Sequence, residues 1–147
     1  MIYFGETDND LTVTFTVAGA PQGKARPRVT KYGTYTPAKT KAYEQAVQLA
    51  YMMQCQGAMF PDVPLVIWVR AYYPIPKSAS KSKREKMLKG EIRPTVKADW
   101  DNIGKAVCDA LNGQAYKDDA YIVDGRVTKW YDENPRIEVE IRTVSDA

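Results

Sequence analysis

The stretch Leu65-Val66-Ile67-Trp68-Val69-Arg70-Ala71-Tyr72-Tyr73 decides the fold of this chain. Every odd-numbered position in it is apolar, which predicts a β-strand with one fully buried face. The even-numbered positions Val66, Trp68 and Tyr72 are apolar as well. We therefore expect this strand to lie inside a sheet that is covered on both faces, and we expect it to end at Pro74.

Weaker patterns on either side of this strand complete the sheet. Residues 11–17 alternate apolar and polar side chains, which predicts a half-buried strand. Residues 137–141 alternate in the same way, which predicts a final strand with one face exposed to solvent. Residues 120–130 are predicted to form a further strand. Residues 29–36, with Gly33 near their middle, predict a short hairpin.

Three segments predict helices, at 37–56, 80–89 and 101–112. Thr36 is the expected N-cap of the first, and its apolar face is expected to comprise Tyr43, Ala46, Val47, Ala50 and Met53. The apolar positions of the third, at i, i+3, i+4, i+7 and i+8, are Ile103, Ala106, Val107, Ala110 and Leu111. This order of elements predicts an α+β fold, a single domain over residues 1–147 with one mixed β-sheet packed by helices.

The composition excludes several kinds of chemistry. The chain has no histidine, which removes the commonest general base and every Ser-His or Cys-His catalytic arrangement. Its two cysteines, Cys55 and Cys108, each stand alone in an apolar helical pattern, so we expect buried thiols in a reducing cytoplasm. No secretion signal or membrane-spanning run is visible, and we expect a cytoplasmic protein that does not bind membranes.

Charge is distributed unevenly along the chain. Residues 11–43 contain no acid but six bases, residues 77–93 contain seven bases and two acids, and residues 99–124 contain six aspartates and two lysines. Basic arms beside an acidic pocket suit a metal-dependent enzyme that acts on a polyanion. The alternative is that these charges are only solvated surface, and for the 77–89 block the sequence leaves open whether it contacts a ligand.

The acidic stretch contains the candidate site. Asp99 and Asp101 lie two residues apart where an extended segment turns into a helix, Lys105 follows one helical turn later, and Asp119 lies at the start of the next strand. Three carboxylates from two elements can hold Mg²⁺, with Mn²⁺ as a substitute, and a metal-bound water could then attack phosphorus. Lys105 could orient that water or offset the charge that gathers in the transition state.

Each of these residues also has a structural interpretation. An acid such as Asp101 at a helix start is more often a cap than a ligand when taken alone, and only the combination with the other three residues reverses that. By default, Asp109, Asp118 and Asp124 are assigned to the surface or to supporting roles. Asn102 is left undecided, and Trp100 is expected to be an apolar anchor rather than a base-stacking group. A calcium loop begun at Asp99 fails because its fifth and twelfth positions are Ile103 and Ala110.

Two parts of the chain resemble the RusA-type Holliday-junction resolvases, in particular their phage and prophage branch. The first part comprises Arg93-Pro94-Thr95-Val96-Lys97-Ala98-Asp99-Trp100-Asp101-Asn102-Ile103-Gly104-Lys105, then Asp109-Ala110-Leu111-Asn112-Gly113 and Lys117-Asp118-Asp119-Ala120. The second part comprises Gly23-Lys24-Ala25-Arg26-Pro27-Arg28 and Tyr35-Thr36-Pro37. The resemblance spans roughly residues 11–142. One departure is Ala98, because members of the family commonly have proline before the first acid, but this change removes no ligand.

The resemblance implies a homodimeric, Mg²⁺-dependent endonuclease that makes paired, symmetric nicks in four-way DNA junctions. The family's catalytic acids and metal ligands fall on Asp99, Asp101 and Asp119, and its essential lysine falls on Lys105. A two-fold dimer would present two equal cleavage sites to a nearly two-fold-symmetric junction.

Three functional hypotheses follow. The first is a DNA endonuclease that resolves recombination intermediates through metal-activated water, with DNA contacts assigned to Lys24, Arg26, Arg28 and Lys31. The alternative is a non-catalytic DNA-binding module of the same fold. A small phosphatase or nucleotide hydrolase is favoured least, because the basic arms exceed what a single phosphate requires.

Overall fold

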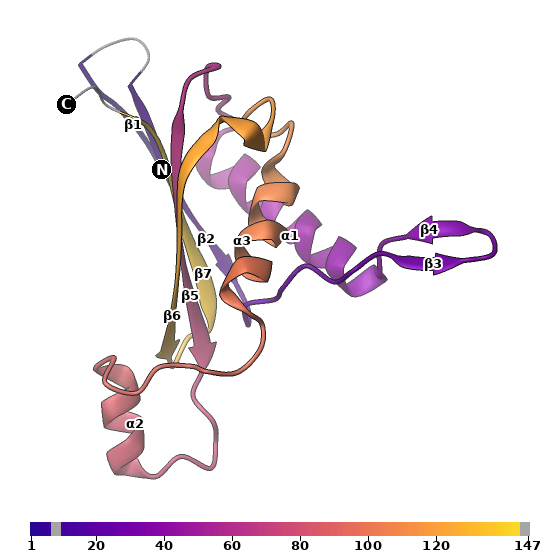
Figure 1. Ribbon diagram of the computed structural model, residues 1–147. Coiled ribbons are helices and arrows are strands. Elements are labelled where there is room, and N and C mark those ends of the chain that lie inside the picture. Colours follow the sequence, from indigo (N-terminus) through magenta and orange to yellow (C-terminus); the bar gives the residue numbers. More distant parts are fainter. Residues whose placement is uncertain (7–9, 145–147) are drawn as a thin grey trace.

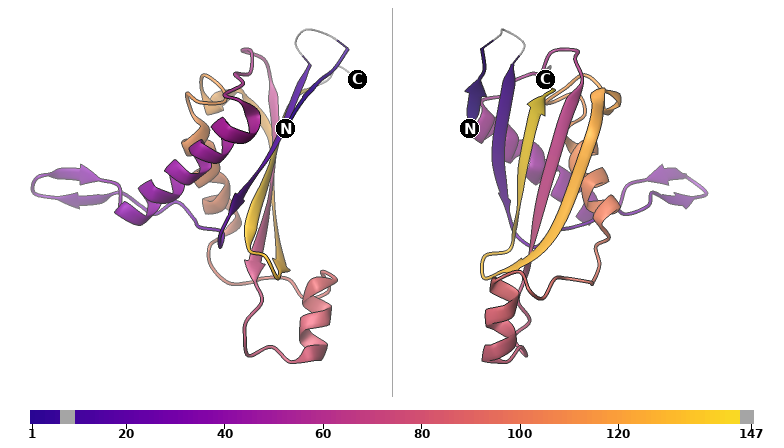
Figure 2. Two further views of the ribbon diagram at one scale, coloured as in Figure 1. Left: turned by 180° about the vertical axis from the view of Figure 1, so that it is seen from behind. Right: turned by 60° about the vertical axis from the view of Figure 1, so that its left-hand side comes forward.

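Five strands form one mixed sheet in the computed structural model, which describes residues 1–6 and 10–144. Their order across the sheet is β1 (Ile2–Phe4), β2 (Leu11–Ala18), β7 (Arg136–Thr143), β5 (Leu65–Pro74) and β6 (Ile122–Asp132). All neighbours are antiparallel except β5 and β6, which are parallel. Two helices, α1 (Ala38–Cys55) and α3 (Trp100–Leu111), pack on the same face of this sheet (Figures 1 and 2). The predicted α+β fold is confirmed, whereas β1 was not predicted.

The interior strand β5 has one buried and one half-buried face. Its odd-numbered residues are buried under the helices, and its even-numbered residues up to Tyr72 are only half-buried. Figure 2 (right) views the sheet from the second face, where α2 (Lys81–Leu88) lies at one end and leaves the rest of that face open. The guanidinium groups of Arg70 and Arg126 lie over the ring of Trp68, at 3.6 and 4.7 Å from its centroid. The prediction that both faces are covered is therefore wrong: on the second face, arginine side chains shield the ring of Trp68 and no helix of the described residues covers the middle of β5 (Figure 2).

Helix α1 buries a face that agrees only in part with the one that its sequence predicted: Tyr43 and Val47 are buried and Ala50 is half-buried. It begins one residue later than predicted, with Pro37 at the N-cap position, and it buries Thr40, Tyr43, Val47, Tyr51 and Cys55. Ala46 is exposed and 73% of Met53 is exposed, so both residues were assigned wrongly. The ring of Tyr51 packs edge-on against Phe15 of β2 with 5.4 Å between centroids, and this contact turns the tyrosine side of the helix toward the sheet.

Helix α3 confirms its predicted amphipathic pattern. Its five predicted apolar residues are all buried, and Gly113 follows its C-cap Asn112 with a φ of 77°. Cys55 is a buried free thiol and Cys108 is a half-buried free thiol, so the expected burial holds fully only for Cys55. A 3-10 helix, η1 (Asp119–Tyr121), precedes β6, so this strand begins two residues later than predicted.

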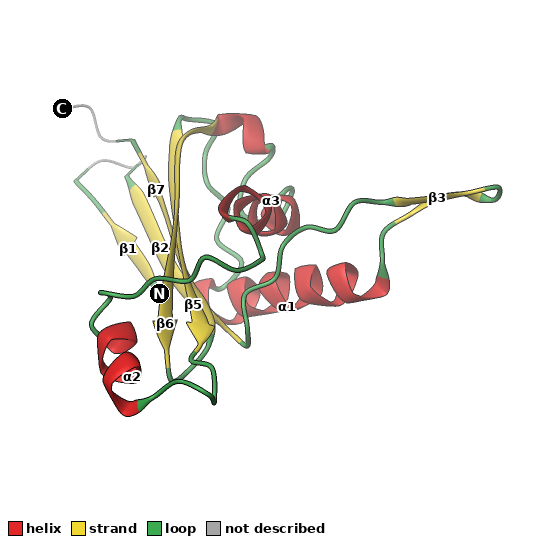
Figure 3. Ribbon diagram, turned by 60° about the horizontal axis from the view of Figure 1, so that its bottom comes forward, coloured by secondary structure: helices red, strands yellow, loops and turns green. Residues whose placement is uncertain are grey.

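The predicted hairpin is confirmed, and it stands apart from the main sheet. Strands β3 (Arg28–Thr30) and β4 (Gly33–Tyr35) pair only with each other among the described residues. The hairpin projects from the N-terminal end of α1, away from the rest of the molecule (Figures 1 and 3).

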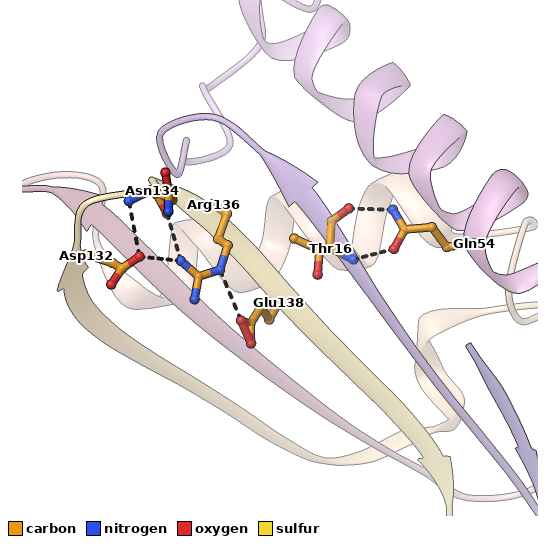
Figure 4. Close-up of polar contacts among 6 residues, drawn as sticks. All are labelled: Thr16, Gln54, Asp132, Asn134, Arg136 and Glu138. Carbon is orange, nitrogen blue, oxygen red and sulfur yellow. Dashed lines mark hydrogen bonds and ion pairs between the residues drawn. The ribbon is translucent and has the colours of Figure 1, made fainter.

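Side chains complete the hydrogen bonding at two places in the sheet, both drawn in Figure 4. The Gln54 amide accepts from the Thr16 N–H at 2.9 Å and donates to the Thr16 carbonyl at 2.7 Å, beyond the point where β1 covers β2. Arg136 donates to Asp132 at 2.7 Å and to Glu138 at 3.1 Å, which ties together the ends of β6 and β7.

Among the described residues, no helix is long and apolar enough to cross a bilayer.

Candidate functional site

The first two candidate carboxylates lie at the start of α3. Asp99 occupies the N-cap position and Asp101 the first turn, and both are exposed. Within the described part of the chain, neither side chain has a hydrogen bond or an ion pair, so the capping interpretation of Asp101 finds no support. The positive end of the helix dipole favours both negative charges. The two carboxylates are therefore available to an external cation.

A hydrogen bond and a close backbone approach hold this helix start in place. The hydroxyl of Tyr73 on β5 donates to the Ala98 carbonyl at 2.7 Å. Burial, and after it the negative charge of Asp99, raises the pKa of Tyr73 to about 12. On the other side, the Lys24 N–H donates to the Asn102 carbonyl at 3.0 Å. A Cβ at Gly23 would lie 2.9 Å from the Ala98 Cβ, so only glycine lets the basic loop approach the helix this closely.

A cavity of about 640 Å³ lies between this basic loop and the start of α3. Asp99 is the one acid among the described residues that line it, and the bases that line it are Lys24, Arg26, Arg28, Lys39 and Lys97. A larger cavity, of about 950 Å³, lies at the β1 side of the sheet and contains none of the predicted site residues. The smaller cavity has the charge pattern of a phosphate-binding site beside a carboxylate.

Asp119 lies near the second half of the same helix. Its N–H donates to the Asn112 side chain at 3.2 Å. Burial, followed by the hydrogen bond to Asp118 and the charges of Asp118 and Asp109, raises the pKa of Asp119 above its ordinary value. Lys105 is exposed, one turn after Asp101. Over residues 1–6 and 10–144, no group of three His, Cys, Asp or Glu side chains stands close enough to hold a metal ion, so the predicted metal site stays a prediction.

Lys24 differs from the other basic residues assigned to DNA. Its ammonium forms an ion pair with Glu44 of α1 and lies 3.4 Å from the Asp109 carboxylate of α3. Partial burial lowers its pKa, but the hydrogen bond and charge of Glu44, with the charge of Asp109, outweigh this and raise it above 10.5. Lys24 thus holds the loop against both helices, whereas Arg26, Arg28 and Lys31 are exposed.

Sequence reasoning misjudged or missed other residues around the site. Trp100 is 63% exposed, so its interpretation as an apolar anchor is wrong. Asp109, expected at the surface or in a supporting role, lies 3.4 Å from the Lys24 ammonium, and Asp118 accepts a hydrogen bond from the Ala120 N–H at 3.0 Å. The sequence analysis did not name Lys97 as a site residue, although it lines the cavity. Its position two residues before Asp99 could have indicated this.

The chain is similar to known proteins along most of its length. Residues 18–142 match the family described as Endodeoxyribonuclease RusA. A protein of Bacillus subtilis (strain 168), named Uncharacterized protein YqaN, is 44% identical to the chain over 139 residues, which cover 90% of this chain and 97% of that relative.

Proposed function

The chain belongs to the RusA family of endodeoxyribonucleases, and from this premise we propose that it resolves four-way DNA junctions by paired, symmetric, Mg²⁺-dependent nicks. One observation carries the proposal. The cavity beside α3 places the uncommitted carboxylate of Asp99 among five basic side chains. This arrangement can bind the DNA backbone next to a group that can ligate a cation.

The donors suit Mg²⁺ in their chemistry. Asp99, Asp101 and Asp119 provide hard carboxylate oxygens, which Mg²⁺ and Mn²⁺ prefer, and they would be the residues that hold the ion. When bound, the ion supplies a Lewis acid that lowers the pKa of a water molecule and stabilises a leaving oxygen. Asp119 is hydrogen-bonded to Asn112 at the C-terminal end of α3, whereas Asp99 lies at its N-terminal end, so Asp119 would have to approach the first two carboxylates to complete the set.

The basic residues of the site would bind the substrate or hold the loop that binds it. Arg26 and Arg28 would bind phosphate oxygens and hold the strand against the start of α3, because guanidinium groups match phosphate geometry. Lys24 would act indirectly, by keeping this loop in place. Lys105, one turn into the helix, would offset the negative charge that develops on the phosphate.

We further propose that the working form is a homodimer. A four-way junction is nearly two-fold symmetric, and a pair of subunits related by a two-fold axis would present one cavity to each of two opposite strands. A single subunit could nick such a junction but would not resolve it.

The test incubates the purified protein with a mobile synthetic four-way junction, with and without Mg²⁺, and measures strand lengths on a denaturing gel. We expect symmetric nicks that need Mg²⁺, and little cleavage of a linear duplex. Asp101→Asn should bind the junction and slow its cleavage by roughly a hundredfold or more. Asp124→Asn is the matched control, because Asp124 is an exposed aspartate of the same acidic stretch outside the predicted set. Cleavage by Asp101→Asn at the wild-type rate would refute the site.

A second candidate is a non-catalytic DNA-binding module of the same fold. The observation that favours it is the lack of an assembled three-ligand group among the described residues. It predicts junction binding without nicks in either Mg²⁺ or Mn²⁺, so the same gel distinguishes it.

A further inference from the structure

The β3–β4 hairpin is the most isolated part of the described molecule. All six residues of its two strands are exposed, and it projects beyond the end of α1 without joining the main sheet (Figure 3). A lone two-stranded hairpin is at best marginally stable in water. A hairpin exposed in this way is therefore expected to be ordered by a binding partner.

Charge identifies the kind of partner. The hairpin lies within residues 11–43, which contain no acid, and its exposed cations include Arg28 and Lys31. Arg28 also lines the cavity that contains Asp99, so one continuous basic surface runs from the candidate site onto the hairpin. A polyanion bound in the cavity would be guided along this surface, and a two-stranded ribbon has dimensions that fit a DNA groove.

The tip adds an aromatic ring to this basic surface. Tyr32 is 88% exposed, and the Lys31 ammonium lies 5.1 Å from the centroid of its ring. The other tyrosine of the hairpin, Tyr35, sits at its base and is 48% exposed. An exposed aromatic ring beside a cation is a feature of surfaces that stack on nucleic-acid bases.

Taking the proposed junction cleavage as given, we propose that the hairpin recognises the branch point, with Tyr32 stacking on bases exposed there. In a continuous duplex each base face is covered by its neighbours, whereas stacking is interrupted where four arms meet. A stacking residue at the tip would therefore add affinity for the branched substrate alone. The cations of the hairpin, Arg28 and Lys31, would add affinity for branched and linear DNA alike.

The experiment measures binding in EDTA, so that cleavage plays no part in the result. Full-length protein is titrated into a four-way junction that contains 2-aminopurine at the branch point, into the same junction with 2-aminopurine in mid-arm, and into a linear duplex of the same sequence. For the wild type we expect a fluorescence change only at the branch point. Tyr32→Ala should abolish this change and weaken junction binding by about fivefold to a hundredfold, with duplex binding unchanged.

Two variants act as matched controls. Tyr32→Phe keeps the ring and should keep the preference for the junction, and Tyr35→Ala removes a tyrosine of the same hairpin away from the tip and should also keep it. Equal weakening of junction and duplex binding by Tyr32→Ala, or no weakening, would overturn the proposal. A change in oligomeric state on gel filtration would overturn it in favour of a contact between subunits. Tyr32→Ala could weaken junction binding selectively while the wild-type protein fails to cleave in Mg²⁺. That outcome would support recognition of the branch point by the hairpin and refute the nuclease proposal.

Discussion

The contact between Lys24, Glu44 and Asp109 predicts a measurable coupling between the basic loop and the two helices. The side chains of Lys24 and Glu44 are 16% and 19% exposed and form an ion pair, and Asp109 is 30% exposed. We would replace Lys24 with Met and Glu44 with Gln, singly and together, and measure the free energy of unfolding of all four proteins. Met keeps most of the length of the lysine side chain, so the change removes mainly the charge.

The expected magnitude follows from the partial burial of these groups. Exposed ion pairs contribute about 0.2–1 kcal/mol, and removing one partner of a fully buried pair costs about 3–5 kcal/mol. Lys24→Met leaves two neighbouring carboxylates without their cation, so we expect a loss between these limits, about 1.5–3 kcal/mol, with a coupling energy of about 1–2 kcal/mol. Because the pKa of Lys24 is raised above 10.5, this contribution is complete at neutral pH and is lost only as the pH rises through the folded-state pKa.

The assay is urea unfolding of the four proteins, analysed as a double-mutant cycle. The chain has its own matched control in the pair Arg84–Glu133, whose side chains are 41% and 58% exposed at a separation of 3.1 Å. A cycle on that pair should give a coupling below about 0.5 kcal/mol that fades with added salt. A Lys24–Glu44 coupling no larger than the Arg84–Glu133 value would refute the structural role of Lys24.

Three further predictions concern the site and the thiols. Gly23→Ala brings a methyl group within 2.9 Å of the Ala98 Cβ, so it should cost about 1–3 kcal/mol in urea unfolding and slow junction cleavage; unchanged stability would contradict the close approach. Trp100→Ala should change the free energy of unfolding by less than about 0.5 kcal/mol, because the ring is exposed, yet weaken junction binding; unaltered binding would exclude Trp100 from the interface. Burial raises the pKa of Cys108 to about 11 and also raises the pKa of Cys55, so both thiols of the folded protein should react slowly with Ellman's reagent at pH 8. Both should react quickly in urea, and a fast reaction of the folded protein would contradict their burial.

Local patterns predicted most of the elements correctly and two residues of one helix face wrongly. The apolar spacing of α3 and the apolar run of β5 are strong signals, and both elements formed where expected. The face of α1 was ambiguous, because Ala46 and Met53 suit either an exposed or a buried position. The contact between Tyr51 and Phe15 decided it, and this contact joins segments that are distant in the sequence.

The candidate site was predictable only where it is local. Asp99 and Asp101 both lie at the start of α3, because the helix begins within one residue of the position that the sequence predicts. The exposure of Trp100 and the position of Asp119 relative to the start of α3 depend on how the helix packs and how the chain returns. No sequence periodicity contains that information.

The sequence by itself determined which segments form helices and strands, and which residue types are present for chemistry, because both follow from neighbours within a few positions. Only the tertiary structure decided which charges are used internally and which face solvent. Lys24 is paired with Glu44 and Asp109, which lie far along the chain, whereas Arg26 and Lys31 are exposed and have no ion pair with any described residue. The physical reason is that an ion pair depends on the distance between charges in space, and the packing of α1, α3 and the basic loop sets that distance.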